Sequence, residues 1–376
     1  MKKKQQLKFR RTHPEIFDLK KLSQQRRLDS LIKSKKLLNI TDNFYEQEKE
    51  LFEIQNPNLI FSKAFTANFQ KFLKKREKKT PKKQRGKWIY FPWNGSLVHI
   101  LEEKEFFLVR TARNQLLITP QEQKKFYFSN IGIAGLSVGS SIALAIVLQG
   151  GGRHLKLADY DLLALSNTNR IKTGIHELGE LKTHITARQI YEINPYAKIE
   201  LFNEGLNKKN LKQFFKGLDV MIDEIDNLEV KFLIRQYSAK NKLPVLMAAD
   251  NADSGVIDIE RYDLNPKLKF FHGRLGKINY AKLSNLDKLE TGRLITKLVG
   301  KENISQRMHI SLSEIGKSIV SWPQLGGTAM LNGAAVAYCA RKILNGQPLE
   351  SNRAIISLDE KLSNAYNTKP SAGKRS

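Results

Sequence analysis

Hydrophobic and polar positions follow one regular pattern through the C-terminal part of the chain. From Asn130 onward, short apolar runs such as "NIGIA" (130–134) alternate with longer helical stretches such as "SSIALAIVLQ" (140–149). This alternation is typical of parallel strands joined by crossover helices. It therefore predicts an α/β fold over residues 129–350, with a Rossmann-like, mainly parallel sheet and flanking helices.

The residues before this part follow other patterns. Residues 1–87 have the composition of charged helices, as in "LSQQRRLDSLIKSKKLL", and end in a basic linker. The stretches "KWIYFPWNGSLVHIL" and "FFLVRTARNQLLITP" resemble short strands that lead into a turn. We therefore predict a basic helical N-terminal extension (1–87), a short strand-rich lead-in segment (88–128) and a C-terminal tail (351–376).

Positive charge is concentrated in the first third of the chain. The formal net charge is +27, and residues 71–87, "KFLKKREKKTPKKQRGK", hold ten Lys or Arg and one Glu. Such a run attracts nucleic acid or an anionic membrane. It has no interleaved aromatic residues of the kind that stack on single-stranded bases. A solvated linker is therefore the favoured interpretation, and nucleic-acid binding is an alternative to it.

Composition excludes several classes of protein. No segment has the ~20 consecutive apolar residues that a membrane-spanning helix requires. The start of the chain, "MKKKQQLKFRRTHPEIF", is basic but has no apolar core of a secretory signal. The single cysteine, Cys339, excludes a disulfide framework and a cysteine-rich zinc site. We expect a cytoplasmic protein without a membrane partner.

A glycine-containing turn follows the first apolar strand of the predicted sheet. In "SNIGIAGLSVGSSIALAIVLQGGG", Gly135, Ser137 and Gly139 lie between the strand and an apolar helix. Backbone N–H groups at such a helix N-terminus bind phosphate oxygens. Serine replaces glycine at two positions of the usual G-x-G-x-x-G pattern, at Ser137 and Ser140, so the motif alone is weak.

The second strand ends in a series of polar residues, "LADYDLLALSNTNR" (157–170). Asp159 follows Gly135 by 24 residues. In a Rossmann unit this is the position of the acid that binds ribose hydroxyls. A helix cap or a surface acid would explain Asp159 alone, but not the series of Asp159, Asp161, Asn167 and Arg170.

This series resembles the D-x-D-x-x-x-x-S-N-x-x-R signature of the ThiF/MoeB/ubiquitin-activating superfamily. Further similarity follows in order, in "ELGELK", "INP" and the D-x-x-x-D-x-x-D-N pattern of "DVMIDEIDN". It covers about residues 130–260, with weaker similarity in "SWPQLGGTAMLNGAAVAYCARKILNG". The resemblance implies an ATP-dependent enzyme that adenylates a carboxylate, such as the C-terminus of a ubiquitin-like protein.

The resemblance also implies roles for individual residues in ATP binding. Asp159 would bind the ribose hydroxyls, beside Asp161. Asn167 and Arg170 would reach the phosphates, where Arg170 would neutralise the charge that develops at the α-phosphate. Lys182 would add a second positive charge on the same phosphates.

Metal binding and dimerisation are further implications of the resemblance. Asp226 would hold Mg²⁺ between the β- and γ-phosphates, because hard cations prefer carboxylate oxygen. Asn227 would help to fix the strand end beside it. Arg110 or Arg113, followed by Asn114, would reach from one subunit of a homodimer into the ATP site of the other. An ordinary surface arginine is an equally good interpretation of this segment.

The sequence also departs from the family. Many members carry two C-x-x-C pairs that bind zinc, and thioester-forming members carry a nucleophilic cysteine. This chain has no C-x-x-C pair, and its single cysteine, Cys339, lies in an apolar helical stretch. We predict a buried structural thiol at Cys339. His272, between "KFF" and "GRLG", is interpreted as a structural histidine.

Other functions remain open at this point. The same turn occurs in NAD-dependent Rossmann oxidoreductases, although no Lys/His/Tyr set for hydride transfer is evident. A third possibility is a non-catalytic nucleotide-binding module, which would have the same fold without enzymatic activity. For an adenylyltransferase, the substrate would be a carboxylate-bearing protein, peptide or small molecule.

Overall fold

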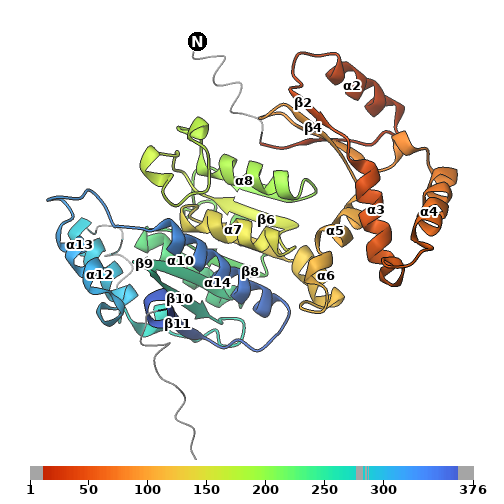
Figure 1. Ribbon diagram of the computed structural model, residues 1–376. Helices are drawn as coiled ribbons and strands as arrows, with labels where there is room; N and C mark the ends of the chain where they lie inside the picture. The colour runs from red at the N-terminus through yellow and green to blue at the C-terminus, as the bar shows by residue number, and fades with distance from the viewer. Residues whose placement is uncertain (1–11, 277–282, 284–285, 287, 363–376) are drawn as a thin grey trace, which may run out of the picture. The chain divides into compact units, whose positions relative to one another are not determined.

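The computed structural model describes residues 12–276, 283, 286 and 288–362 (Figure 1). The chain divides into two compact units, residues 125–186 with 198–376 and residues 1–124 with 187–197. Below, the first is called the sheet unit and the second the N-terminal unit. Within the described residues, no helix is both long and apolar enough to span a lipid bilayer.

Seven strands form the centre of the sheet unit. They are β5 (Asn130–Ala134), β6 (His154–Ala158), β7 (Lys198–Phe202), β8 (Val220–Asp223), β9 (Val245–Asn251), β10 (Ser254–Glu260) and β11 (Asn352–Ser357). Their spatial order is β11-β10-β9-β8-β5-β6-β7. The pairs from β7 to β9 are parallel, and β10 is antiparallel to both of its neighbours. The predicted Rossmann-like, mainly parallel sheet is therefore confirmed.

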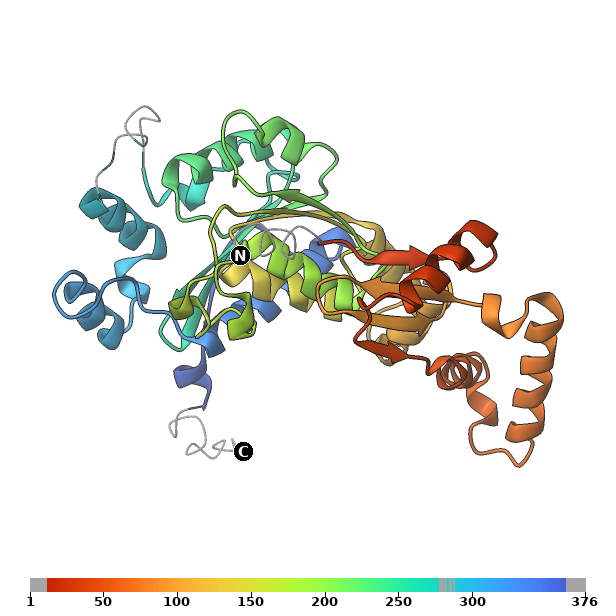
Figure 2. The same ribbon diagram turned by 90° about the horizontal axis from the view of Figure 1, so that it is seen from above.

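Helices cover both faces of this sheet (Figure 2). From β5, the chain passes through α7 (Val138–Leu148) to β6, whereas from β8 it passes through α10 (Leu228–Asn241) to β9, in the opposite direction along the sheet. Because parallel crossovers are right-handed, the opposite directions put α7 and α10 on opposite faces. Strand β5 therefore lies where the direction of winding reverses.

Two helices on the α7 face approach each other closely. Helix α14 (Gly326–Leu344) packs along α7 and also contacts β9 and β10. A Cβ atom added to Gly333 would lie 2.9 Å from the backbone carbonyl carbon of Ser141 on α7. The small residues of "MLNGAAVAYCA" are what permit this contact. It fixes the start of α14 near the carboxyl ends of the strands.

The opposite face carries an aromatic core. Helix α9 (Leu211–Phe215) packs there with α10, and the buried cluster includes Phe202, Phe214, Ile234 and Tyr262. The chain between β10 and α14 adds α12 (Lys288–Val299) and α13 (Gln306–Ser313), and α15 (Leu358–Leu362) follows β11. Helix α8 (Lys182–Ile193) begins in the sheet unit, and its residues from Ala187 onward belong to the N-terminal unit.

The N-terminal unit contains its own small sheet. Strands β1 (Glu15–Phe17), β3 (Lys87–Phe91), β4 (Ser96–Ile100) and β2 (Asn39–Thr41) lie in that order. Its helices are α2 (Leu22–Ile32), α3 (Phe44–Gln55), α4 (Phe65–Lys79), α5 (Glu103–Arg110) and α6 (Pro120–Phe128), whose last residues belong to the sheet unit. Segments on both sides of residue 87 thus contribute strands to one sheet.

At two places in the N-terminal unit, the secondary structure differs from what the sequence predicted. Strands β1 and β2 occur in a region for which the sequence predicted helices alone, because three-residue strands are too short to show an alternating pattern. The stretch "FFLVR" was expected to be a strand and is the end of α5. Phe106, Leu108 and Val109 pack there against a cluster with Phe44 and Leu51 of α3. This packing outweighs the β-preference of the residues.

Candidate active site

Most of the sequence-predicted site residues lie at one edge of the large sheet. They follow the carboxyl ends of β5, β6 and β8, the edge at which parallel α/β sheets bind ligands where the winding reverses. Each set of residues occupies its own loop there.

The turn after β5 is packed tightly against the end of β8. Gly135 has a φ of +86°, and a Cβ atom there would lie 2.2 Å from the carbonyl oxygen of Glu224. Only glycine avoids this clash and also adopts the backbone conformation without strain. Ser137 occupies the N-cap position of α7, but its side chain caps no N–H of that helix. The N–H groups of the first turn of α7 are therefore available to an anion.

Asp159 is buried behind this turn and is held by backbone donors. Its Oδ2 accepts a hydrogen bond from Leu136 N (2.6 Å), and its Oδ1 accepts one from Asp161 N (2.8 Å). Burial raises the pKa of Asp159, while the charge of Lys182 and these two N–H groups act in the opposite direction. Each carboxylate oxygen keeps a further lone pair for a hydroxyl donor.

Lys182, at the start of α8, completes this cluster. Its Nζ lies 2.7 Å from Oδ2 of Asp161, and its backbone N donates to Asp161 O. The lysine side chain is buried, whereas the Asp161 side chain is half exposed. The ion pair thus holds the ammonium group beside Asp159, at the edge that the turn after β5 also reaches.

Arg170 joins the second polar loop to the glycine turn. Its Nε donates to Ser137 Oγ (2.9 Å), and its Nη1 donates to Asn169 Oδ1 (2.9 Å). Burial lowers the pKa of Arg170, and the carboxylates of Asp250 and Asp226 oppose this decrease. The guanidinium group is therefore within electrostatic reach of acids on β9 and after β8.

Asn167 has a local structural contact. Its Oδ1 accepts a hydrogen bond from Ala164 N (3.1 Å) and closes a single helical turn, Leu165–Asn167. This bond shapes the loop that carries Arg170. The predicted contact of Asn167 with a phosphate stays a prediction.

Asp226 lies exposed after β8, just before α10. Among the described residues, its carboxylate has no hydrogen-bond donor, and no group of three or more His, Cys, Asp or Glu forms a candidate metal site. The next residue, Asn227, caps α10 by accepting from Val230 N (3.0 Å). Asn227 thus fixes the start of α10 next to Asp226, and the strand-end role that the resemblance implied for it stays a prediction.

A third wall of the site was not predicted from the sequence. Asp250, at the end of β9, is buried and accepts hydrogen bonds from Asn332 Nδ2 of α14 (2.6 Å) and from Gln324 Nε2 (3.0 Å). Gln324 O accepts in turn from Asn169 Nδ2 (2.8 Å). A chain of hydrogen bonds therefore runs from α14 and β9 through Gln324 and Asn169 to Arg170.

Glu224 is a second residue that the sequence did not single out. Its Oε1 accepts a hydrogen bond from Ala248 N (2.7 Å), and its side chain lies against Gly139 of α7. Burial raises the pKa of Glu224 well above its ordinary value, while the charge of Lys231 acts against this increase. A carboxyl group that resists ionisation thus lies behind the glycine turn.

A buried charge network lies beneath the end of β8. Arg235 of α10 donates to Asp223 and, through Nε, to Glu260 Oε2 (2.8 Å), and all three side chains are buried. Lys231 Nζ also lies 3.2 Å from Asp223 Oδ2. These ion pairs tie α10 to β8 and β10 below the loop that carries Asp226.

The remaining candidate residues lie elsewhere. Arg113 is exposed in a short turn (Ala112–Asn114) of the N-terminal unit, so its reach into a partner's site stays a prediction. Cys339 is buried in α14, and burial raises the pKa of its thiol to about 11, so the predicted buried thiol is confirmed. His272 Nε2 lies 3.4 Å from Oδ1 of Asp258. Arg353 forms an ion pair with the same aspartate.

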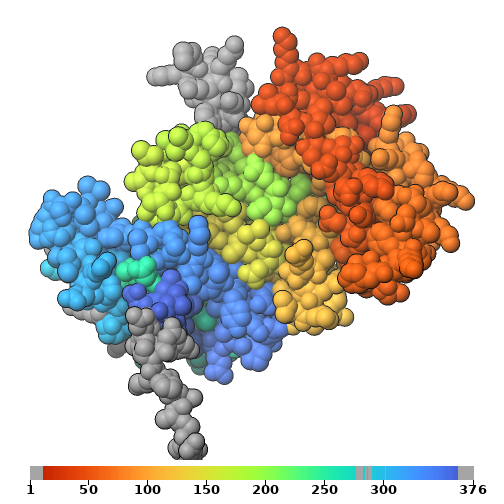
Figure 3. Space-filling model, in the orientation of Figure 1, coloured from red at the N-terminus to blue at the C-terminus, as the bar shows by residue number. Residues whose placement is uncertain are grey.

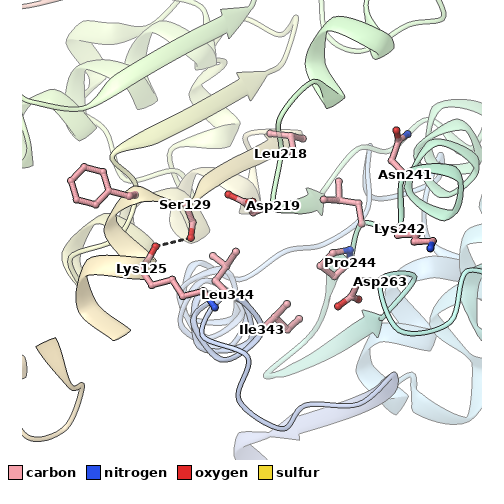
Figure 4. A pocket seen from close by; sticks show the side chains of 12 residues that line it. Lys125, Ser129, Leu218, Asp219, Asn241, Lys242, Pro244, Asp263, Ile343 and Leu344 are labelled. Carbon is pink, nitrogen blue, oxygen red and sulfur yellow. Dashed lines mark hydrogen bonds between the residues drawn. The ribbon is translucent and has the colours of Figure 1, made fainter. Parts of the chain in front are cut away.

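A separate hollow lies at the opposite edge of the sheet. It has a volume of about 550 Å³ and is lined by residues next to the amino ends of β5, β8 and β9, among them Ser129, Asp219 and Pro244 (Figure 4). None of the predicted site residues lines it. It is therefore distinct from the polar edge described above.

Topology and side chains together define a Rossmann-like α/β domain with a candidate nucleotide-binding edge. Residues 111–272 match the model of the ThiF family. This stretch of the chain is therefore similar to a ThiF-family domain.

Several curated proteins are similar to parts of this chain. The chain is 37% identical to an uncharacterized protein of Mycobacterium tuberculosis over 73% of this chain and 38% of the relative. It is 27% identical to a probable molybdopterin-synthase adenylyltransferase of Porphyra purpurea over 44% of each chain. It is 29% identical to a tRNA threonylcarbamoyladenosine dehydratase of Haemophilus influenzae over 35% of this chain and 51% of that one. The chain thus spans from 38 to 51% of the length of these relatives.

Proposed function

We propose that this protein is an ATP-dependent adenylyltransferase that activates a carboxylate as an acyl-adenylate. ATP would supply the adenylyl group and release pyrophosphate. The observation that carries the proposal is the contact between Arg170 and Ser137 at the uncapped start of α7. It puts a guanidinium group beside helical N–H groups, and this combination favours phosphate over a neutral ligand.

The residues present fit a nucleotide with Mg²⁺. Asp159 has lone pairs for the two ribose hydroxyls and is fixed by its backbone donors. Arg170, Lys182 and the N–H groups of α7 would hold the phosphates. The exposed carboxylate of Asp226 would hold Mg²⁺ by the oxygen ligation that this ion prefers. Lys182 would bind phosphate while Asp161 keeps its ammonium group in position.

The substrate would be a carboxylate-bearing protein, peptide or small molecule. Relatives named as adenylyltransferase and as tRNA threonylcarbamoyladenosine dehydratase support the chemistry in general and name no common acceptor. A thioester on Cys339 is not part of the proposal, because its buried thiol has a raised pKa and thiolate is the nucleophilic form. The activated carboxylate would pass to an acceptor directly.

We also propose that the protein acts as a homodimer. Arg113 is exposed in the N-terminal unit and has a long, permanently charged side chain. In the proposed dimer it would enter the nucleotide site of the partner subunit. Sedimentation velocity of the parent at micromolar concentration tests the dimer, and a stable monomer excludes it. Pyrophosphate exchange by Arg113→Ala tests the role of the arginine, and activity equal to that of the parent excludes this role.

The central experiment compares two nucleotides. Calorimetric titration with Mg-ATP and with NAD identifies the ligand, and exchange of labelled pyrophosphate into ATP across candidate carboxylates identifies the reaction. We expect Mg-ATP to bind and NAD to be ignored. Binding of NAD alone would establish a Rossmann oxidoreductase instead. Mg-ATP binding without exchange for any carboxylate would leave a non-catalytic nucleotide-binding module.

A further inference from the structure

The basic run at residues 71–87 forms an ordered lysine face. Most of the run lies within α4, which is helical to Lys79, so this part is not a linker. Five lysines of α4 are exposed and form no ion pair with any described residue: Lys71, Lys74, Lys75, Lys78 and Lys79. At 100° per residue they fall within an arc of about 140° on the helix. Together we call them the lysine face.

Three other cations of the run are neutralised inside the N-terminal unit. Arg76 pairs with Glu48 (2.7 Å) and Glu105 (2.6 Å), and Arg85 pairs with Glu48 (3.1 Å). Lys87 pairs with Asp18 (3.0 Å). The run therefore contains two populations of cations, one that stabilises the fold and one that points to solvent without a counter-charge.

The only acid of the run does not neutralise the lysine face. One oxygen of Glu77 pairs with Arg85 (3.1 Å), and the other accepts from the backbone N of Lys82 (3.3 Å). Lys82 and Lys83, just beyond α4, are also exposed and have no ion pair within the described part of the chain. Figure 3 shows long side chains projecting from this region of the surface. Binding of an anion relieves the self-repulsion among these close ammonium groups.

The apolar side of α4 is already buried, and this decides between two kinds of anionic partner. Phe69 is buried and lies 5.5 Å from Phe52 of α3, between ring centroids, and Phe65 and Phe72 surround the same ring. A helix that lies on a membrane inserts an apolar face below the headgroups. α4 has no such face left, so its lysines favour a partner with charge alone, arranged along a line.

We propose that the lysine face binds the phosphate backbone of a nucleic acid without reading its base sequence. The five lysines extend over about 12 Å of helix, a length along which duplex DNA presents about seven phosphate charges. Lysine ammonium groups act as point charges on phosphate and carry no base specificity. The proposal is independent of the nucleotide chemistry at the large sheet.

The test counts the phosphates that the lysine face contacts. Fluorescence anisotropy with labelled DNA and RNA duplexes of mixed sequence is measured between about 50 and 200 mM salt. The variant carries Lys71→Gln, Lys74→Gln, Lys75→Gln and Lys78→Gln, exposed changes that keep good helix formers. We expect at least a tenfold loss of affinity for DNA. The salt slope should fall by about 3.6, since each phosphate contact contributes about 0.9.

A matched variant separates a built surface from bulk charge. Lys209→Gln, Lys212→Gln, Lys216→Gln and Lys240→Gln remove the same charge from exposed positions of the sheet unit. This control should change the slope by less than about 1, the contribution of a single phosphate contact. An equal loss in both variants, no binding by the parent at about 50 mM salt, or binding only to phosphatidylserine vesicles would each overturn the proposal. Circular dichroism verifies that both variants are folded, and the DNA and RNA arms identify the preferred backbone.

Discussion

The Nε of Arg170 donates a hydrogen bond to Ser137 Oγ at 2.9 Å, across 33 residues of sequence. The contact connects the glycine turn after β5 with the polar loop after β6. It explains why serine is useful at a position where the usual motif has glycine: the hydroxyl orients the guanidinium group beside the start of α7. The contact therefore joins the two motifs into one unit, which we propose binds the phosphates of a nucleotide.

Arg170→Ala should weaken Mg-ATP binding by about tenfold to a hundredfold. The reason is the loss of charge-assisted hydrogen bonds, which contribute about 1.5–3 kcal/mol each. Ser137→Ala should have a smaller effect, because it frees the guanidinium group without removing it. Calorimetric titration of both variants measures this order. Lys212→Ala, an exposed change on α9, serves as the control, and equal affinities for all three variants would show that Arg170 lies outside the nucleotide site.

Asp226→Asn and Asp159→Asn should impair different steps: the first should lower the rate of reaction, and the second should weaken ATP binding. Loss of the proposed Mg²⁺ ligand should lower the rate of pyrophosphate exchange by orders of magnitude and change nucleotide affinity far less, because charge stabilisation is needed most in the transition state. Loss of the ribose ligand should appear mainly as weaker ATP binding. Titration and exchange assays on both variants give the comparison. Identical profiles would mean that the two carboxylates do not have separate roles.

The strand pattern of the sequence was enough to predict that the loops with the main polar residues lie close together. Ser137, Asp159 and Asp226 each follow a parallel strand, and parallel strands end at the same edge of a sheet, so their loops must be neighbours. The resemblance to a family then supplied the roles of Arg170, Lys182 and Asp226. It also drew attention to Asn227, which caps α10 just after β8.

The third wall of the site could not be predicted in this way. Asp250 meets Gln324 and Asn332 across 74 and 82 residues, and none of the three belongs to a recognisable local motif. Their meeting depends on where α14 packs against β9, which follows from small residues on α14 and not from polar spacing. The strand expected at 106–110 was wrong for a similar reason, because packing against α3 decided its structure.

Replacing Arg235 by methionine should destabilise the sheet unit by about 3–5 kcal/mol. The change leaves Asp223 and Glu260 buried without their shared cation, and removal of one partner of a buried ion pair has a cost of this size. Urea unfolding followed by circular dichroism measures it. Adding Asp223→Asn and Glu260→Gln to the same variant should recover much of the loss. Lys208→Met, which breaks an exposed pair with Glu229, should cost less than about 1 kcal/mol.

Glu224→Gln should stabilise the protein in a manner that depends on pH. The folded-state pKa of Glu224 is raised by burial, so the folded protein holds this proton more tightly than the unfolded chain does. Stability from the group is therefore complete below its ordinary pKa of 4.5 and is lost as pH rises through the folded value, by at most about 1.4 kcal/mol per pH unit. Glutamine keeps an oxygen for Ala248 N–H and cannot ionise. The Tm of the variant should equal that of the parent near pH 4 and exceed it at pH 8, and a constant difference across this range would show that Glu224 ionises as freely in the fold as in the unfolded chain.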